Sequence, residues 1–280
     1  MQELVLTLSC PDRPGIVHAV SGFLAERDCN ILDSQQYGSP RTSTFFLRMH
    51  VESTVAVADL REQFVAIADA FGMTWQMHAA DEEQRVLVLV SRMGHCLNDL
   101  LYRWRSGYLP GVLAAVGSNH TDLQSLTASY DVPFHHLPVT PATRDEQEEQ
   151  ILSLVTTLDV DLVVLARYMQ VLSPRLCDAL PGRIINIHHS FLPSFRGGRP
   201  YDQAYEHGVK LIGATAHYVT AELDEGPIIE QEVARVGHEH RPEALAAVGR
   251  DLECVALARA VRWHLEHRVL LDGQRTVVFP

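Results

Sequence analysis

The stretch Ile184–Pro193, IINIHHSFLP, decides how this chain is interpreted. Its β-branched first half predicts a buried strand over residues 184–188. Because side chains alternate along a strand, Asn186 and His188 project to the same side where the strand ends. The prolines and glycines of residues 193–200 indicate a loop whose backbone can approach a ligand closely. We therefore expect a ligand site at this strand end.

A second stretch, His217–Pro227 with the sequence HYVTAELDEGP, adds an acidic residue at another strand end. Taken alone, Asp224 is a turn residue, and His188 is a strand-end histidine with satisfied hydrogen bonds. Together with Asn186, they supply a carboxylate, an imidazole and an amide donor. These groups suit attack on a carbonyl, because the oxyanion needs a donor and the nucleophile needs a base. The combination predicts an enzyme.

The two stretches together resemble the folate-dependent formyltransferases. The matching patterns are Asn-x-His-x-Ser-x-Leu-Pro from Asn186 and His-Tyr-Val-x-x-x-Leu-Asp-x-Gly-Pro from His217. The resemblance covers residues 85–280 and implies a Rossmann-like, mostly parallel α/β domain. It also implies that Asn186, His188 and Asp224 form the catalytic trio.

Strand and helix patterns alternate through the same region. This alternation predicts a mostly parallel sheet covered on both faces, with ligands at the carboxyl ends of its strands. The predicted strands cover residues 85–90, 112–116, 134–139, 162–166 and 184–188, and the predicted helices cover residues 97–104, 121–130, 144–158 and 242–268.

Residues 1–80 predict a smaller domain, joined to the rest by the polar residues 81–84. Its patterns follow the order β-α-β-β-α-β, which is that of a ferredoxin-like α+β fold. The order and the Asp-Arg-Pro-Gly turn at residues 12–15 resemble the ACT domain, a regulatory module that often binds amino acids. A dimerisation unit without a ligand is the alternative.

An amino-acid effector would have a natural place in this domain. The free N–H groups of the helix that follows the turn can meet a carboxylate. The candidate effector-binding residues are Asp12, Gly15 and Asn30, and the resemblance implies methionine or glycine bound in a homo-oligomer.

Composition excludes several other classes of protein. The formal net charge is −12 and no run of Lys or Arg occurs, so nucleic acid is not an expected ligand. The five cysteines are scattered, which favours reduced thiols over a disulfide framework. With no secretory signal and no long apolar run, we expect a cytoplasmic protein that does not enter membranes.

Metal and nucleophilic mechanisms are weaker interpretations of the same residues. The chain has no HExxH motif, and the adjacent residues His188 and His189 are expected on opposite faces of the strand. Ser190 lacks a G-x-S-x-G context, and Cys96 beside His95 is no thiolate dyad by itself. We expect no metal and no cofactor.

The resemblance places the folate between two segments. In related enzymes a loop after an apolar strand holds the pterin, and Gln170 stands in this loop where many relatives carry arginine. Each residue of this loop that could line the pterin slot can instead serve in ordinary packing. Residues 196–200 are expected to form a cationic loop, which either reaches the glutamate tail of the folate or lies on the surface. The expected substrate-binding residues are Met169, Val171, Leu172, Val219 and Leu223.

The acceptor distinguishes a hydrolase from a transferase. Where ribonucleotide formyltransferases hold a phosphate with a Gly-Ser-Asn loop, this chain has His95 and Cys96. His189 stands where those enzymes usually have proline, and the basic carboxy-terminal domain of tRNA formyltransferases is missing. These features and the ACT-like domain resemble the deformylase branch, with His95 and His189 as candidate active-site support.

The resemblance therefore implies hydrolysis of the substrate 10-formyltetrahydrofolate to tetrahydrofolate and formate. Such an enzyme supplies formate for purine biosynthesis and balances the one-carbon folate pool. Two alternatives stay open at this point. One is a formyltransferase with an amine acceptor, and the other is a non-catalytic amino-acid sensor.

Overall fold

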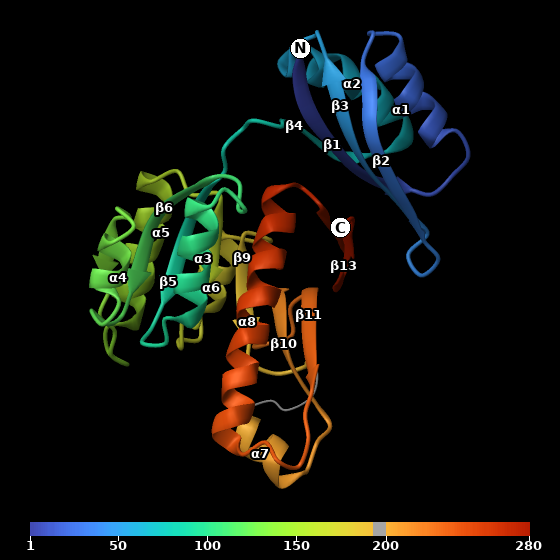
Figure 1. Cartoon of the computed structure of the whole chain (residues 1–280). Coiled ribbons are helices and arrows are strands. Elements are labelled where there is room, and N and C mark those ends of the chain that lie inside the picture. Colours follow the sequence, from blue (N-terminus) through green and yellow to red (C-terminus); the bar gives the residue numbers. More distant parts are fainter. Residues whose placement is uncertain (193–199) are drawn as a thin grey trace. The chain divides into compact units, whose positions relative to one another are not determined.

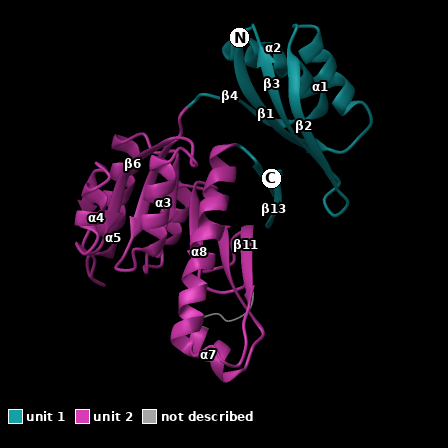
Figure 2. Ribbon diagram, in the orientation of Figure 1, with its two compact units in different colours: residues 1–82, 267–280 teal, residues 83–266 magenta. Residues whose placement is uncertain are grey.

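The computed structural model describes residues 1–192 and 200–280. The chain divides into two compact units, which Figure 2 shows in different colours. The first unit comprises residues 1–82 and 267–280, and the second comprises residues 83–266. The sequence places residues 267–280 in the second domain, whereas the structure packs them with the first unit.

The first unit is an antiparallel sheet with two helices packed on it (Figure 1). Alternate residues Leu4, Leu6 and Leu8 of one strand pack with Phe23 and Phe64 of the helices, all nearly inaccessible. The predicted ferredoxin-like order is confirmed. The sheet order is β2-β3-β1-β4, and the elements are β1 (Gln2–Pro11), α1 (Ile16–Ala25), β2 (Asn30–Ser39), β3 (Thr44–Ser53), α2 (Val57–Phe71) and β4 (Thr74–Ala79).

A hairpin from the end of the chain, β12 (Val269–Asp272) and β13 (Arg275–Val278), belongs to this first unit. The carboxylate of Asp272 accepts hydrogen bonds from Ser39 Oγ and from Thr42 Oγ1, both at 2.8 Å. The hairpin is thereby fixed to residues that lie more than two hundred positions earlier in the chain.

The second unit is a seven-stranded sheet with the order β11-β10-β9-β8-β5-β6-β7. The five strands from β9 to β7 are parallel, β10 is antiparallel to β9, and β11 is antiparallel to β10. The mostly parallel fold that the sequence predicts is confirmed. The strands are β5 (Arg85–Val90), β6 (Val112–Ser118), β7 (Phe134–His136), β8 (Leu162–Leu165), β9 (Ile184–His188), β10 (Leu211–Tyr218) and β11 (Ile228–Arg235).

Helices cover this sheet, and the longest of them, α8, runs past β10 and β11 (Figure 1). The strand expected over residues 134–139 ends at His136, because Pro138 has no N–H to donate. No helix among the described residues is long and apolar enough to cross a membrane. The helices are α3 (His95–Arg105), α4 (Gln124–Ala128), α5 (Arg144–Thr157), α6 (Pro174–Ala179), α7 (Pro200–Glu206) and α8 (Pro242–Leu265).

Candidate active site

A cavity of about 310 Å³ lies at the carboxyl ends of β8 and β9 in the second unit. Strand register explains its location, because Asn186 of β9 pairs with Leu165 of β8 on one side and with His217 of β10 on the other. The predicted trio Asn186, His188 and Asp224 lines the cavity. The five residues expected to hold the folate line it as well, namely Met169, Val171, Leu172, Val219 and Leu223.

His188 and Asp224 are neighbours inside this cavity. The Nδ1 atom of His188 lies 3.3 Å from Asp224 Oδ2, and the His188 side chain is buried. The hydrogen bond from His188 lowers the pKa of Asp224, which keeps the carboxyl ionised. With Nδ1 directed at the carboxylate, Nε2 of the neutral ring carries the lone pair. Within the described residues this Nε2 has no hydrogen-bond partner, so it is available to a substrate or water.

A tight loop after β10 holds Asp224 in place. Asp224 adopts a left-handed conformation with φ of 56°. Two residues later, Gly226 lies so close to the preceding strand that a Cβ atom would be 1.7 Å from the Tyr218 carbonyl oxygen. Pro227 in turn accepts a hydrogen bond from the Tyr218 N–H through its carbonyl oxygen, at 2.9 Å. The loop can therefore close against β10 only with glycine at position 226.

Gly226→Ala is expected to lower kcat at least tenfold, because the loop must move away from Tyr218 and carry Asp224 with it. The free energy of unfolding should also fall, by roughly 1–3 kcal/mol, as expected for overpacking. Gly22→Ala is the matched control, since a Cβ at that helical position meets nothing within 4 Å. Initial rates and chemical denaturation would be measured for both variants. Parental activity in Gly226→Ala would show that the loop has another way to close.

His217 is a functional residue that the sequence interpretation used only as part of a motif. Its Nδ1 donates to the Tyr218 carbonyl oxygen at 2.8 Å, which leaves Nε2 as an acceptor. Asn186 Nδ2 donates to this Nε2 at 3.2 Å. Burial lowers the pKa of His217, so the ring stays neutral and able to accept. His217 thus fixes the orientation of the Asn186 amide.

The two candidate support histidines have different environments. His189 lines the cavity and stacks on His188, with ring centroids 5.0 Å apart. The expectation that these two rings lie on opposite faces is wrong, because the strand ends at His188 and the chain bends there. Burial first, and then electrostatic interactions with Arg167 and His188, lower the pKa of His189 to about 4. His95 does not line the cavity.

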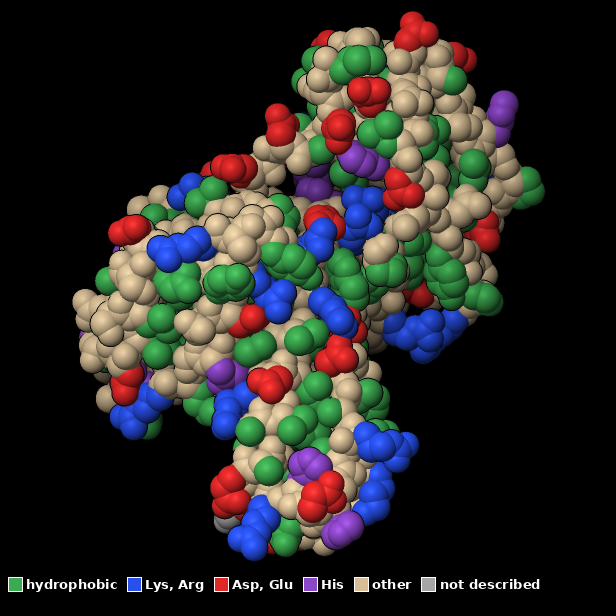
Figure 3. All heavy atoms as spheres, in the orientation of Figure 1, with side chains coloured by type: hydrophobic (Ala, Val, Ile, Leu, Met, Phe, Trp, Pro, Cys, Tyr) green, Lys and Arg blue, Asp and Glu red, His purple; other side chains and the backbone are tan. Residues whose placement is uncertain are grey.

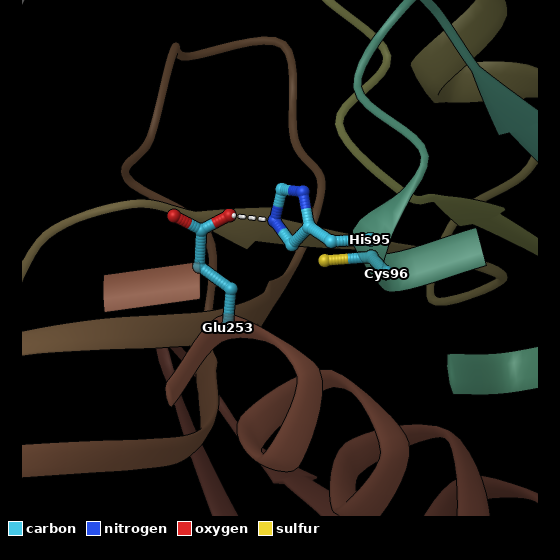
Figure 4. A group of neighbouring side chains, drawn as sticks. All are labelled: His95, Cys96 and Glu253. Atoms are coloured by element: carbon cyan, nitrogen blue, oxygen red, sulfur yellow. Dashed lines mark hydrogen bonds and ion pairs between the residues drawn. The ribbon is translucent and has the colours of Figure 1, made fainter. Parts of the chain in front are cut away.

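His95 instead forms a partly buried pair with Glu253 of α8 (Figure 4). Its Nε2 donates to Glu253 Oε2 at 2.7 Å. In the described part of the chain, Cys96 joins them in a group whose ligand atoms lie within 4.8 Å of one another, close enough to hold a metal ion. However, Arg167 Nε already lies 3.5 Å from the same carboxylate, and a hydrogen bond to Cys254, with burial, raises the pKa of Cys96. An ion pair with Arg167 therefore describes Glu253 better than a metal site.

The candidate effector residues of the first unit do not come together within one chain. Gly15 has a φ of 96° and begins α1. Asp12 follows β1 at the end where Pro11 pairs with Thr44, whereas Asn30 pairs with Glu52 at the opposite end of the same sheet. One ligand can meet both groups only where two copies of the unit associate.

Charged side chains of both signs occur together on one face of the molecule. On the face drawn in Figure 3, Lys and Arg side chains are interspersed with Asp and Glu side chains.

Comparisons with known proteins bear on both units. The formyl transferase family matches residues 84–261, and the ACT domain family matches residues 4–69. The chain is 49% identical to the formyltetrahydrofolate deformylase of Bacillus subtilis, with 98% of this chain and 93% of that protein covered. A corresponding enzyme of Escherichia coli is 40% identical, with 99% of both chains covered.

Solved structures give the same picture. The structure is similar to the crystal structure of formyltetrahydrofolate deformylase from Burkholderia mallei, with a TM-score of 0.96, 49% identity and full coverage of both chains. A glycinamide ribonucleotide transformylase from Symbiobacterium toebii is also similar, with a TM-score of 0.67 and 34% identity. That similarity covers 71% of this chain and 95% of the transformylase.

Proposed function

Because this chain belongs to the formyltetrahydrofolate deformylases of the formyl transferase family, we propose that it hydrolyses 10-formyltetrahydrofolate to tetrahydrofolate and formate. The observation that supports this proposal best is the arrangement of Asn186, His188 and Asp224 around one cavity. The resulting formate would enter purine biosynthesis, and the hydrolysis would balance the pool of one-carbon folates.

Attack of water begins the reaction. The lone pair on His188 Nε2 accepts a proton from water as the hydroxyl oxygen bonds to the formyl carbon. Asp224 lies 3.3 Å from the other ring nitrogen and stabilises the imidazolium that forms. His188 therefore serves as the general base, with Asp224 as its partner.

The formyl oxygen takes on negative charge in the same step. Asn186 donates from its side-chain amide, and His217 holds that amide in orientation at 3.2 Å. When the tetrahedral intermediate collapses, the C–N bond breaks and the folate nitrogen takes the proton from His188. The hydroxyl of water thus stays on the formyl carbon as formic acid, which releases its proton to solvent as formate, and the other proton of water goes to the amine.

The pterin is proposed to lie between two walls of the cavity. Met169 and Val171 lie on one wall and are about half exposed, and Val219 and Leu223 lie on the other. Gln170 also lines the cavity, where it can form hydrogen bonds with the ring edge. The cationic loop expected to reach the glutamate tail falls on residues 196–200, most of which lie outside the described residues.

An assay for formate release tests this function directly. The purified chain should produce one formate for each 10-formyltetrahydrofolate consumed, with no amine acceptor added and with EDTA present. Formyl transfer only upon addition of an amine would support the transferase alternative. Binding of amino acids with no turnover would support the sensor alternative.

We further propose that the first unit self-associates and binds a small amino acid where two copies meet. The match to the ACT family supports this proposal. Because Asp12 and Asn30 lie at opposite ends of the sheet within one chain, a ligand that meets both would have to lie between two copies. Calorimetric titration with glycine, methionine and a panel of other amino acids should reveal binding, and the effector should change the rate or affinity by about 5–150-fold at most. Asp12→Ala is expected to weaken that binding without changing the basal rate. If no amino acid of the panel bound, this unit would have a purely structural role.

A further inference from the structure

A buried arginine lies in the wall of the cavity and is not used by the mechanism above. Arg167 follows β8 and has a left-handed φ of 63°, although its side chain is bulky. Such a conformation costs on the order of 1–2 kcal/mol outside glycine, so its retention in a binding site points to a function. The side chain is 8% exposed and lines the cavity together with His188 and His189.

The guanidinium group has more donors than its partners among the described residues can satisfy. Its Nε lies 3.5 Å from Glu253 Oε2 and, within that part of the chain, makes no hydrogen bond. A second nitrogen contacts the sulfur of Met93 at 3.7 Å, which is a weak interaction. An arginine has five N–H groups, and unsatisfied buried donors are costly. Nε is itself buried, and Arg167 lines the cavity, so an anion bound there would complement a positive charge whose donors are only partly satisfied.

Glu253 holds this arginine in place but does not satisfy all of its hydrogen-bond donors. The carboxylate is 1% exposed and accepts from His95 Nε2 at 2.7 Å and from the Tyr201 hydroxyl at 3.0 Å. Both of its oxygens are thus engaged by other donors. The Tyr201 ring lies 6.4 Å from the ring of His189, which in turn stacks on His188. The cluster of Arg167, Glu253, His95 and Tyr201 is therefore continuous with the catalytic histidine.

Hydrolysis of a formyl group creates an anion at this place. Formate is a small planar carboxylate, and a guanidinium group binds such a group with two parallel hydrogen bonds. We propose that Arg167 is the formate subsite, with Glu253 as its positioning residue. The proposal rests on the hydrolytic function above, because only that reaction delivers formate beside His188.

Product inhibition tests the subsite in the full-length chain. Sodium formate is the probe, sodium chloride at equal ionic strength is the salt control, and formamide is the uncharged isostere. Formate should inhibit hydrolysis, and formamide should inhibit it far less. Arg167→Met should raise the inhibition constant for formate at least about tenfold, the change expected when a charge-assisted pair is lost. Arg175→Met is the matched control, since that arginine is exposed and pairs with Glu149.

Arg167→Lys keeps the charge but removes the planar fork, so its inhibition constant should fall between those of the parent and Arg167→Met. Arg167→Lys also tests the formate subsite if Arg167→Met does not fold. An unchanged inhibition constant in either folded variant would overturn the proposal, as would the absence of formate inhibition in the parent. Both results differ from failure of the proposed function, in which the parent would release no formate at all.

Discussion

Asp224→Asn is expected to reduce kcat by about 10²–10⁴-fold, which is the usual cost of losing a general base or its partner. The amide has the shape of the carboxylate but cannot stabilise the imidazolium of His188, 3.3 Å away. Because Asp224 is held ionised in the folded protein, its negative charge is present at neutral pH and the substitution removes it. Steady-state formate production would be measured beside folate affinity and thermal stability.

Glu225→Gln is the control for this variant, since it removes an exposed carboxylate from the neighbouring position of the same loop. We expect it to retain parental kcat. If Asp224→Asn kept activity within threefold of the parent, Asp224 would have no part in the chemistry.

His188→Ala and Asn186→Ala should each lower kcat by about 10²–10⁴-fold while KM changes little. Both side chains are proposed to interact with the shifting proton and the developing oxyanion, not with the pterin. A rise in KM with kcat unchanged would make either residue a binding contact. His217→Gln extends the test, because it should reproduce part of the Asn186→Ala defect by releasing the amide that His217 orients.

Local patterns were sufficient where the structure depends on local chemistry. The apolar, β-branched run before Asn186 forms β9 with the predicted ends, because both of its faces are covered in a parallel sheet. The N-cap of α6 is also visible in the sequence as Ser173 followed by proline, and Ser173 Oγ accepts the Leu176 N–H at 3.3 Å. The resemblance to the family then predicted that Asp224 lies at the same site.

Interactions between distant residues were not predictable in this way. Glu253 and Arg167 meet although 86 positions separate them, and a charged residue within a long helix ordinarily indicates a surface position. A strand ending near His217 was expected, but the extent of β10 was not predicted, because glycine and alanine have low strand propensity. Gly213 is needed in this strand because a Cβ atom there would lie 2.7 Å from the Glu232 carbonyl oxygen. The assignment of residues 267–280 to the first unit likewise depends on contacts such as Asp272 with Ser39.

That last contact determines how the first unit can be exchanged or removed. Its polypeptide is interrupted by residues 83–266, so the catalytic unit is an insert with both of its ends joined to the same module. Removing residues 1–82 alone would leave the β12–β13 hairpin without the hydroxyl groups that bind Asp272. A chimera with another ACT module therefore needs two junctions, one on each side of the insert. Recombination that acquires or loses this module in evolution faces the same double requirement.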